Sequence, residues 1–323
     1  MNVLGIETSC DETSAAVVRN GRTILSNIVT SSLKEHKKYG GIIPEIASRR
    51  QLEWITTIVE EALAQANVQL DDIDAIAVTQ KPGLIGSLLV GIAFAQSLSF
   101  ALRKPLIEVD HIQAHIYANF LATKATKKAI HLPKLPAIGL VVSGGHSSLF
   151  YIPSFKDYKP IGQTRDDAVG EAFDKVARIL ELGYPGGPII DQLAQRGVNR
   201  DLHFACAELP KTLDFSFSGI KTAVLYYKRE HEHKSHFSPA KIAYAFQESV
   251  VSVIVKKCME ACLKYNTKTL LVGGGVAANS SLCTRLKEAS VKHHIDVSYP
   301  PLNLCLDNAA MVAGLGYQLL HQK

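Results

Sequence analysis

Two histidines, His111 and His115, lie four positions apart in a stretch without glycine or proline. In an α-helix, residues at this spacing lie on one face with their Cβ atoms about 5–6 Å apart, so two imidazoles can reach one metal ion. Zinc proteases with the pattern H-E-x-x-H need a glutamate directly after the first histidine as general base. That position holds Ile112. The pair therefore predicts a metal site that lacks the base of a protease.

Asp307, near the C-terminus, is the candidate for a third metal ligand. It precedes Asn308 and the segment 309–313, whose composition favours a helix, so its simplest role is the N-cap of that helix. Its alternative role is to add an oxygen ligand to the histidine pair. Two histidines and one carboxylate leave coordination positions open, which is typical of catalytic rather than structural metal sites. This donor set suits Zn²⁺ and Fe²⁺ alike.

Three turns rich in glycine or polar residues each follow an apolar, strand-like segment. The first, at 7–13, carries hydroxyl and carboxylate groups suited to phosphate or a hydrated metal. The second, at 143–148, contains two adjacent glycines whose backbone N–H groups can approach a phosphate closely. The third, at 273–279, ends at Asn279, the expected N-cap of the next helix, where an anion or a nucleoside edge is favoured. It matches neither the Walker A loop nor the Rossmann pattern.

The order of the expected elements indicates an α/β protein with a duplicated architecture. Strands are expected at 3–8, 13–19 and 23–29, and Asn20-Gly21 is a strong hairpin signal between the last two. A similar unit recurs, with strands at 137–142 and 149–152. Two copies of strand, polar turn and strand predict two lobes with a ligand between the turns.

Prolines mark the expected boundary between the lobes, at Pro133 and Pro136. The first lobe is expected at 1–133 and carries the histidine pair. The second is expected at 134–307 and binds the nucleotide. The last helix, 308–323, is expected to return to the first lobe.

Composition is that of a compact enzyme: 323 residues, 47% hydrophobic and 20% charged. The net charge of +5 permits a polyanionic partner but does not demand one, and the short basic clusters are best interpreted as surface loops. The six cysteines form no C-x-x-C pair, which favours a reduced, intracellular protein. The N-terminus shows no basic leader or cleavage site, so a cytoplasmic location is expected.

The segment 82–102 contains no charged residue before Arg103 and is long enough to span a bilayer. However, it contains several glycines and serines and follows the strand-like segment 73–78. A strand, a glycine-bearing turn and a buried helix account for it better. We therefore expect no membrane partner.

Motifs along nearly the whole chain resemble those of the Kae1/TsaD family, the tRNA threonylcarbamoyl-adenosine transferases. They occur in the family's order: GIETSCDET (5–13), GGIIPEIASR (40–49), VSGGH (142–146), GEAFDKVA (170–177), YPGGP (184–188), FSFSGIKT (215–222), GGVAAN (274–279) and DNAAM (307–311). Two departures stand out. Gln51 replaces a histidine that is usual in the family, and Gln113 and Ala114 replace glutamate and glycine within the family's H-x-E-G-H. Neither removes an expected metal ligand, although Gln113 can change the hydrogen bonds behind the ligands.

The resemblance implies a two-lobed actin/Hsp70-like (ASKHA) fold with a duplicated mixed-sheet core. It also implies transfer of the threonylcarbamoyl group from L-threonylcarbamoyl adenylate to N6 of the adenosine 3′ of the anticodon, in tRNAs reading ANN codons. By motif correspondence, His111, His115 and Asp307 would carry one iron or zinc ion. The residues expected to hold the adenylate are Val141, Val142, Ser143, Gly144, Gly145, Asp174, Gly187, Asp191 and Asn279.

Asp11 and Glu12, in the first polar turn, are the candidate catalytic carboxylates near the reacting carbonyl. The relatives also imply protein partners. Bacterial members work with a catalytically silent paralogue and a small ATPase, and tRNA is the acceptor substrate.

Other functions are weaker interpretations of the same residues. Ser143 lacks the first glycine of a G-x-S-x-G elbow, because Val141 is there, so a serine hydrolase is not indicated. An ATP-dependent kinase or O-carbamoyltransferase of the same fold is the enzymatic alternative, but a kinase would hold Mg²⁺ with carboxylates and phosphates rather than imidazoles. An inactive scaffold paralogue would be expected to lack the metal ligands.

Overall fold

The computed structural model describes residues 1–123, 132–198, 201–235 and 237–321. The chain forms two compact units. The first comprises Met1–Pro133, Ser154–Asp157 and Pro300–Lys323, and the second comprises Lys134–Pro153 and Tyr158–Tyr299. The chain returns to the first unit at Pro300 rather than after Asp307, so Asp307 and the histidine pair belong to the same unit.

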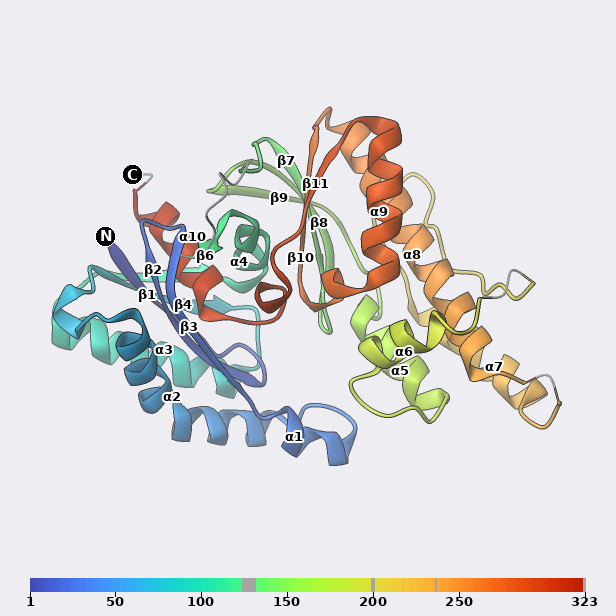
Figure 1. The fold of residues 1–323 in the computed structure, drawn as a ribbon, viewed down its shortest axis with the longest axis horizontal. Coiled ribbons are helices and arrows are strands. Elements are labelled where there is room, and N and C mark those ends of the chain that lie inside the picture. Colours follow the sequence, from blue (N-terminus) through green and yellow to red (C-terminus); the bar gives the residue numbers. More distant parts are fainter. Residues whose placement is uncertain (124–131, 199–200, 236, 322–323) are drawn as a thin grey trace. The chain divides into compact units, whose positions relative to one another are not determined.

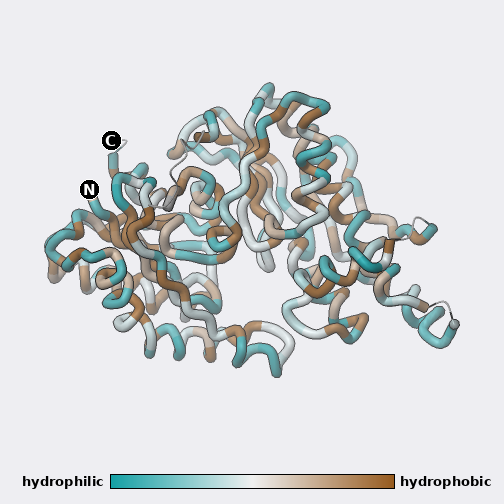
Figure 2. The backbone as a smooth tube through the Cα atoms, viewed as in Figure 1, coloured by the Kyte–Doolittle hydropathy of each residue, from teal (hydrophilic) through white to brown (hydrophobic). Residues whose placement is uncertain are grey.

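The first unit is built on a mixed sheet with the strand order β5-β4-β1-β2-β3-β6. Its strands are β1 (Asn2–Glu7), β2 (Glu12–Arg19), β3 (Thr23–Ser31), β4 (Ala75–Lys81), β5 (Leu106–Asp110) and β6 (Ala122–Thr123). The expected meander is confirmed, because β1 pairs antiparallel with β2 and β2 antiparallel with β3. Asn20 (φ 51°) and Gly21 (φ 69°) adopt the positive φ that such a hairpin turn requires. The central strands run through hydrophobic sequence (Figure 2).

The helices of this unit are α1 (Leu33–His36), α2 (Pro44–Ala66), α3 (Ile85–Leu102), α4 (His111–Tyr117) and α10 (Ala309–His321). Helices α2 and α3 cover one face of the sheet and α10 covers the other (Figure 1). Successive side chains along β1 point to opposite faces of the sheet. Leu4 and Ile6 join the core beneath α2 and α3, whereas a Cβ on Gly5 would lie 2.3 Å from the carbonyl oxygen of Ala309 in α10. Only glycine therefore allows α10 to approach the strand this closely.

Helix α3 is the apolar segment expected to be a buried helix. The helix is present, but the burial prediction is wrong: only 17% of its 18 residues are buried. Ile85, Leu89 and Phe100 are 79%, 60% and 87% exposed. Its length and composition would allow it to cross a membrane, and a single helix of this kind is weak evidence for that.

The second unit repeats the arrangement of the first. Its sheet has the order β11-β10-β7-β8-β9, in which β10 pairs parallel with β7 and β7 antiparallel with β8. The strands are β7 (Ala137–Val142), β8 (Ser147–Ser154), β9 (Asp157–Gln163), β10 (Thr269–Gly273) and β11 (Asp296–Ser298). The same succession, with a meander followed by parallel strands, is seen in β5-β4-β1-β2-β3. The predicted duplication is therefore confirmed.

The helices of the second unit are α5 (Val169–Ile179), α6 (Gly186–Ala194), α7 (Ser218–His231), α8 (Pro239–Lys264) and α9 (Ser280–His293). Helix α8 packs against α6 and α9 and also contacts strands β7 and β10 (Figure 1). The polar turns that follow β7 and β10 lie at the carboxyl ends of two parallel strands, which is where open α/β sheets bind their ligands.

Candidate metal centre and nucleotide site

The histidine pair is positioned by a short, capped helix. Helix α4 starts directly after β5, and the Asp110 carboxylate accepts hydrogen bonds from the backbone N–H groups of Ile112 (3.0 Å) and Gln113 (3.1 Å). The predicted helix is confirmed. His111 and His115 are both buried, and their ring centroids are 4.6 Å apart.

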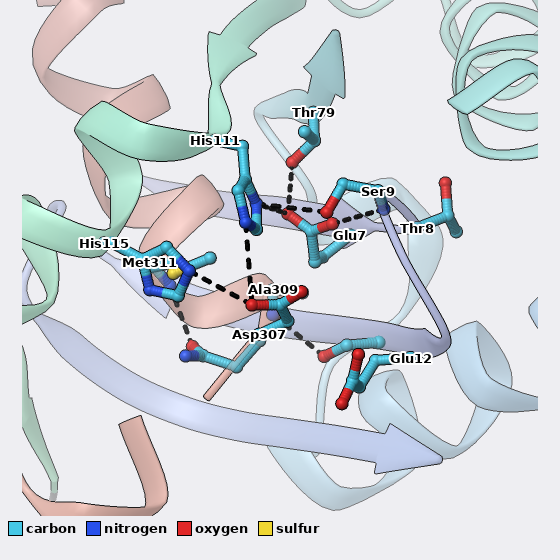
Figure 3. A network of polar contacts seen from close by, with 12 residues as sticks. Glu7, Thr8, Ser9, Glu12, Thr79, His111, His115, Asp307, Ala309 and Met311 are labelled. Carbon is cyan, nitrogen blue, oxygen red and sulfur yellow. Dashed lines mark hydrogen bonds and ion pairs between the residues drawn. The ribbon is translucent and has the colours of Figure 1, made fainter. Parts of the chain in front are cut away.

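Asp307 lies against both histidines rather than capping α10. Its Oδ1 is 3.1 Å from Nε2 of His115 and 3.6 Å from Nε2 of His111 (Figure 3). The capping role falls to Asn308, whose side-chain oxygen accepts a hydrogen bond from the backbone N–H of Met311 at 3.1 Å. One ligand atom from each of the three residues lies within 4.8 Å of the others. Two imidazole nitrogens and a carboxylate oxygen thus converge on one point.

The surroundings of His111 fit a metal ligand. Its Nδ1 is 3.0 Å from Oε2 of Glu7, so a proton on Nδ1 leaves the Nε2 lone pair directed toward Asp307. Burial alone would lower the pKa of His111, but the carboxylates of Asp307 and Glu7 outweigh it and raise the pKa to about 9. Burial likewise opposes ionisation of Glu7, yet His111 lowers the pKa of Glu7 below its usual value. The site therefore favours positive charge.

The turn between β1 and β2 carries the two candidate carboxylates. Oδ2 of the buried Asp11 accepts a hydrogen bond from the Ser31 hydroxyl at 2.9 Å. The Asp11 carbonyl accepts hydrogen bonds from both the backbone N–H and the hydroxyl of Ser32. Burial, together with the charges of Asp307 and Asp11, raises the pKa of Glu12 well above its usual value. Glu12 therefore holds its proton more firmly than an ordinary glutamate does.

Gln51 stabilises this turn, a role that its position in the sequence did not reveal. The buried Nε2 of Gln51 donates to the carbonyl oxygens of Glu12 (2.9 Å) and Cys10 (3.0 Å), with that of Thr8 at 3.4 Å. The only signal in the sequence was that Gln51 replaces the usual histidine of the family. The Gln51 side chain thus helps to hold the backbone of the carboxylate turn.

The second unit presents open backbone at Gly144 and Gly145. The turn closes on itself, because Ser143 N–H donates to the carbonyl of His146 and His146 N–H donates to the Ser143 hydroxyl. A Cβ added at Gly144 or Gly145 would meet no atom within 4 Å. A ligand can therefore reach this backbone. Val141 and Val142 are fully buried, so they can meet a ligand through their backbone only.

The other expected adenylate residues lie around the same end of the sheet. Asp174 accepts a hydrogen bond from Gly186 N–H (2.6 Å), at the start of the helix that carries Gly187 and Asp191. Burial raises the pKa of Asp174, although the N–H groups of Gly186 and Gly187 oppose this. Asp191 accepts from the backbone N–H and the hydroxyl of Ser280 at 3.0 and 2.8 Å.

Asn279 is the N-cap of α9, as predicted: its side-chain oxygen accepts from Leu282 N–H at 2.9 Å, and its amide donates to Gln247. A hollow of about 260 Å³ lies beside it, between the end of α6 and the first turns of α8 and α9. Its lining is Ala194, Gln195, Val198, Tyr244, Gln247, Glu248, Ser280, Ser281, Thr284 and Arg285. This hollow is therefore adjacent to both Asp191 and Asn279.

Comparison with known proteins decides the family. The model of the family described as tRNA N6-adenosine threonylcarbamoyltransferase matches residues 23–314. The protein of that name from Clostridium botulinum (strain 657 / Type Ba4) is 50% identical over 319 residues, which cover 98% of this chain and 92% of the relative. This chain belongs to the tRNA N6-adenosine threonylcarbamoyltransferase family. A relative of the same name from Bacillus cereus is 50% identical over 317 residues, covering 97% and 90% of the two chains.

Solved structures confirm the fold expected of a threonylcarbamoyltransferase. Full-length HypF in a phosphate- and nucleotide-bound form superposes with a TM-score of 0.64 at 15% identity, over 100% of this chain and 47% of HypF. Component A of (R)-2-hydroxyglutaryl-CoA dehydratase from Acidaminococcus fermentans superposes with a TM-score of 0.55 at 14% identity, over 99% and 98% of the chains. Both have the actin-like ASKHA architecture. The chain is thus an ASKHA-fold transferase that modifies tRNA.

Proposed function

We propose that this threonylcarbamoyltransferase uses L-threonylcarbamoyl adenylate as donor and modifies N6 of the adenosine 3′ of the anticodon, in tRNAs reading ANN codons. The observation that carries the proposal is the convergence of His111, His115 and Asp307 in the unit that also presents Asp11. In the reaction, a bond forms between N6 and the carbamoyl carbon, the bond from that carbon to the phosphate oxygen breaks, and AMP leaves.

We propose further that His111, His115 and Asp307 hold one iron or zinc ion per chain. When bound, such an ion supplies Lewis-acid chemistry that polarises the carbonyl and offsets the charge on the leaving phosphate. The buried imidazoles and the carboxylate fit this role, because each directs a donor atom to the same point.

The remaining residues bind the donor and move a proton. The open backbone at Gly144 and Gly145 can donate hydrogen bonds to the phosphate without introducing a competing nucleophile. Val141, Val142, Ser143, Asp174, Gly187, Asp191 and Asn279 complete the adenylate site, and the hollow beside Asn279 offers a place for the base. A carboxylate of the first turn, Asp11 or Glu12, accepts the proton that N6 loses as the tetrahedral centre collapses.

A direct transfer assay tests this function. Purified protein is incubated with threonylcarbamoyl adenylate and unmodified tRNA in a single turnover, and the digested nucleosides are identified by mass. We expect N6-threonylcarbamoyladenosine and AMP in equal amounts. A kinase of the same fold would instead consume ATP without modifying the tRNA, and an inactive scaffold would give neither product.

We propose that a catalytically silent paralogue and a small ATPase support this activity in the cytoplasm. The exposed apolar side of α3 supports a protein partner. Leu89 and Phe100 are 11 positions apart, which places them within about 20° of each other around the helix, and Ile85 is one turn from Leu89. An apolar surface of this kind, unusual on a soluble protein, favours docking of another protein.

Charges on this side of α3 should prevent assembly with the paralogue. Leu89→Glu combined with Phe100→Glu should weaken the complex at least about 100-fold, because both carboxylates would have to be desolvated in the interface. Single-turnover transfer by the isolated chain should stay unchanged. The matched control is Val291→Glu with Leu302→Glu, two other exposed apolar positions. Equal affinities of the two double variants in sedimentation experiments would exclude α3 as the docking surface.

A further inference from the structure

Glu7, the last residue of β1, is a fully buried carboxylate with three hydrogen-bond partners (Figure 3). Its Oε1 accepts from the backbone N–H of Ser9 at 2.5 Å. Its Oε2 accepts from the Thr79 hydroxyl at 2.5 Å and lies 3.0 Å from Nδ1 of His111. Both oxygens are thus occupied, and the side chain is held in one orientation.

Strand alternation places this carboxylate behind the metal site. Glu7 is two residues after Gly5, so it points to the face of the sheet that α10 covers, whereas Ile6 points into the core beneath α2 and α3. A buried carboxylate costs several kcal/mol unless it is well paired. The N–H of Ser9 and the hydroxyl of Thr79 are neutral donors, whereas the imidazole can carry a positive charge. The imidazole is the partner that benefits from the negative charge.

We infer that Glu7 is a positioning residue for the metal ligand His111. Its carboxylate accepts a hydrogen bond from Nδ1–H, fixes that tautomer and directs Nε2 toward the point shared with Asp307. An ionised acceptor behind the ring also makes Nε2 a stronger electron donor to a metal. This inference rests on the proposed metal site and adds a residue that does not touch the metal.

The two histidines differ in the groups that contact their Nδ1 atoms. Nδ1 of His115 is buried without a hydrogen-bond partner among the described residues. The Ser9 hydroxyl is a second neighbour of His111 Nδ1, at 3.2 Å, but a hydroxyl carries no charge. Both rings contact Asp307 through Nε2, but among the described residues only His111 also has a carboxylate at Nδ1, so loss of Glu7 should act through His111.

Metal affinity, measured without tRNA or adenylate, tests the inference. The chelator-treated protein is titrated with Zn²⁺ and with Co²⁺, whose visible spectrum reports ligand geometry. We expect Glu7→Gln, which keeps the shape but loses the charge, to weaken binding about 10- to 100-fold and to shift the Co²⁺ bands. The matched control is Glu108→Gln, an exposed carboxylate on β5 that should bind as the wild type does. Wild-type affinity and spectrum in Glu7→Gln would overturn the inference, even if its melting temperature fell.

A second variant keeps the inference testable if Glu7→Gln folds poorly. Thr79→Val removes one hydrogen bond to Glu7 while keeping the carboxylate, and we expect a smaller loss of affinity, about threefold or more. Unchanged metal affinity in this variant would count against a positioning role for Glu7.

Failure of the proposed function and failure of this inference give different results. A wild-type protein that binds the metal but transfers nothing would overturn the proposed function alone. A wild-type protein that binds neither Zn²⁺ nor Co²⁺ would overturn the metal site and this inference with it.

Discussion

Replacing His115 by alanine should remove the bound metal and lower single-turnover transfer by at least about 10²-fold, and His111→Ala with His115→Ala should abolish both. The effect of the single variant His115→Ala is easier to interpret. It removes an imidazole that contacts Asp307, and it leaves the Glu7–His111 pair intact. The double variant also strips Glu7 of its cationic partner, so its melting temperature should fall while the protein stays soluble.

Metal content per chain and transfer are measured on the same preparations. His293→Ala with His294→Ala, at the end of α9 in the second unit, removes two imidazoles that lie outside the site and should change neither quantity. Full transfer by a double variant at His111 and His115 that contains no metal would disprove the assignment of these residues.

Asp11→Ala should lower single-turnover transfer by roughly 10²-fold or more, with little change in the affinity for the adenylate. A carboxylate that accepts the N6 proton contributes in the transition state rather than in the bound donor. The competing explanation is structural: an Asp in a tight turn can simply hold that turn, and its loss would then weaken binding and stability together.

The contacts of Asp11 allow the two roles to be separated. Its carboxylate accepts a hydrogen bond from the Ser31 hydroxyl. The hydrogen bonds from Ser32 go to the backbone carbonyl of Asp11, so they can form whatever side chain replaces Asp11. Ser31→Ala therefore removes the same side-chain hydrogen bond but keeps the carboxylate, and it should transfer at close to the wild-type rate. A Ser31→Ala variant as slow as Asp11→Ala, with an equally lowered melting temperature, would assign Asp11 to the turn.

Local periodicity in the sequence was sufficient for the elements themselves. The spacing of His111 and His115 requires only one turn of helix, and Asp110 caps that helix from the adjacent position. The meander, its Asn20-Gly21 turn and the N-cap at Asn279 follow in the same way from neighbours in the chain. Such features are predictable because their hydrogen bonds close within a few residues.

Burial and long-range partners were decided only by the tertiary structure. The composition of α3 predicted a helix, but its exposure depends on which elements cover it, and that was predicted wrongly. Whether Asp307 caps α10 or lies against the histidines depended on α10 returning to the first sheet, which Gly5 permits because a glycine lets the helix approach β1. Glu7 and Gln51 gave no sign of their contacts, because His111 and the carbonyls of the carboxylate turn lie tens of positions away in the sequence. Side chains of this kind acquire a function only when the fold has brought their partners to them.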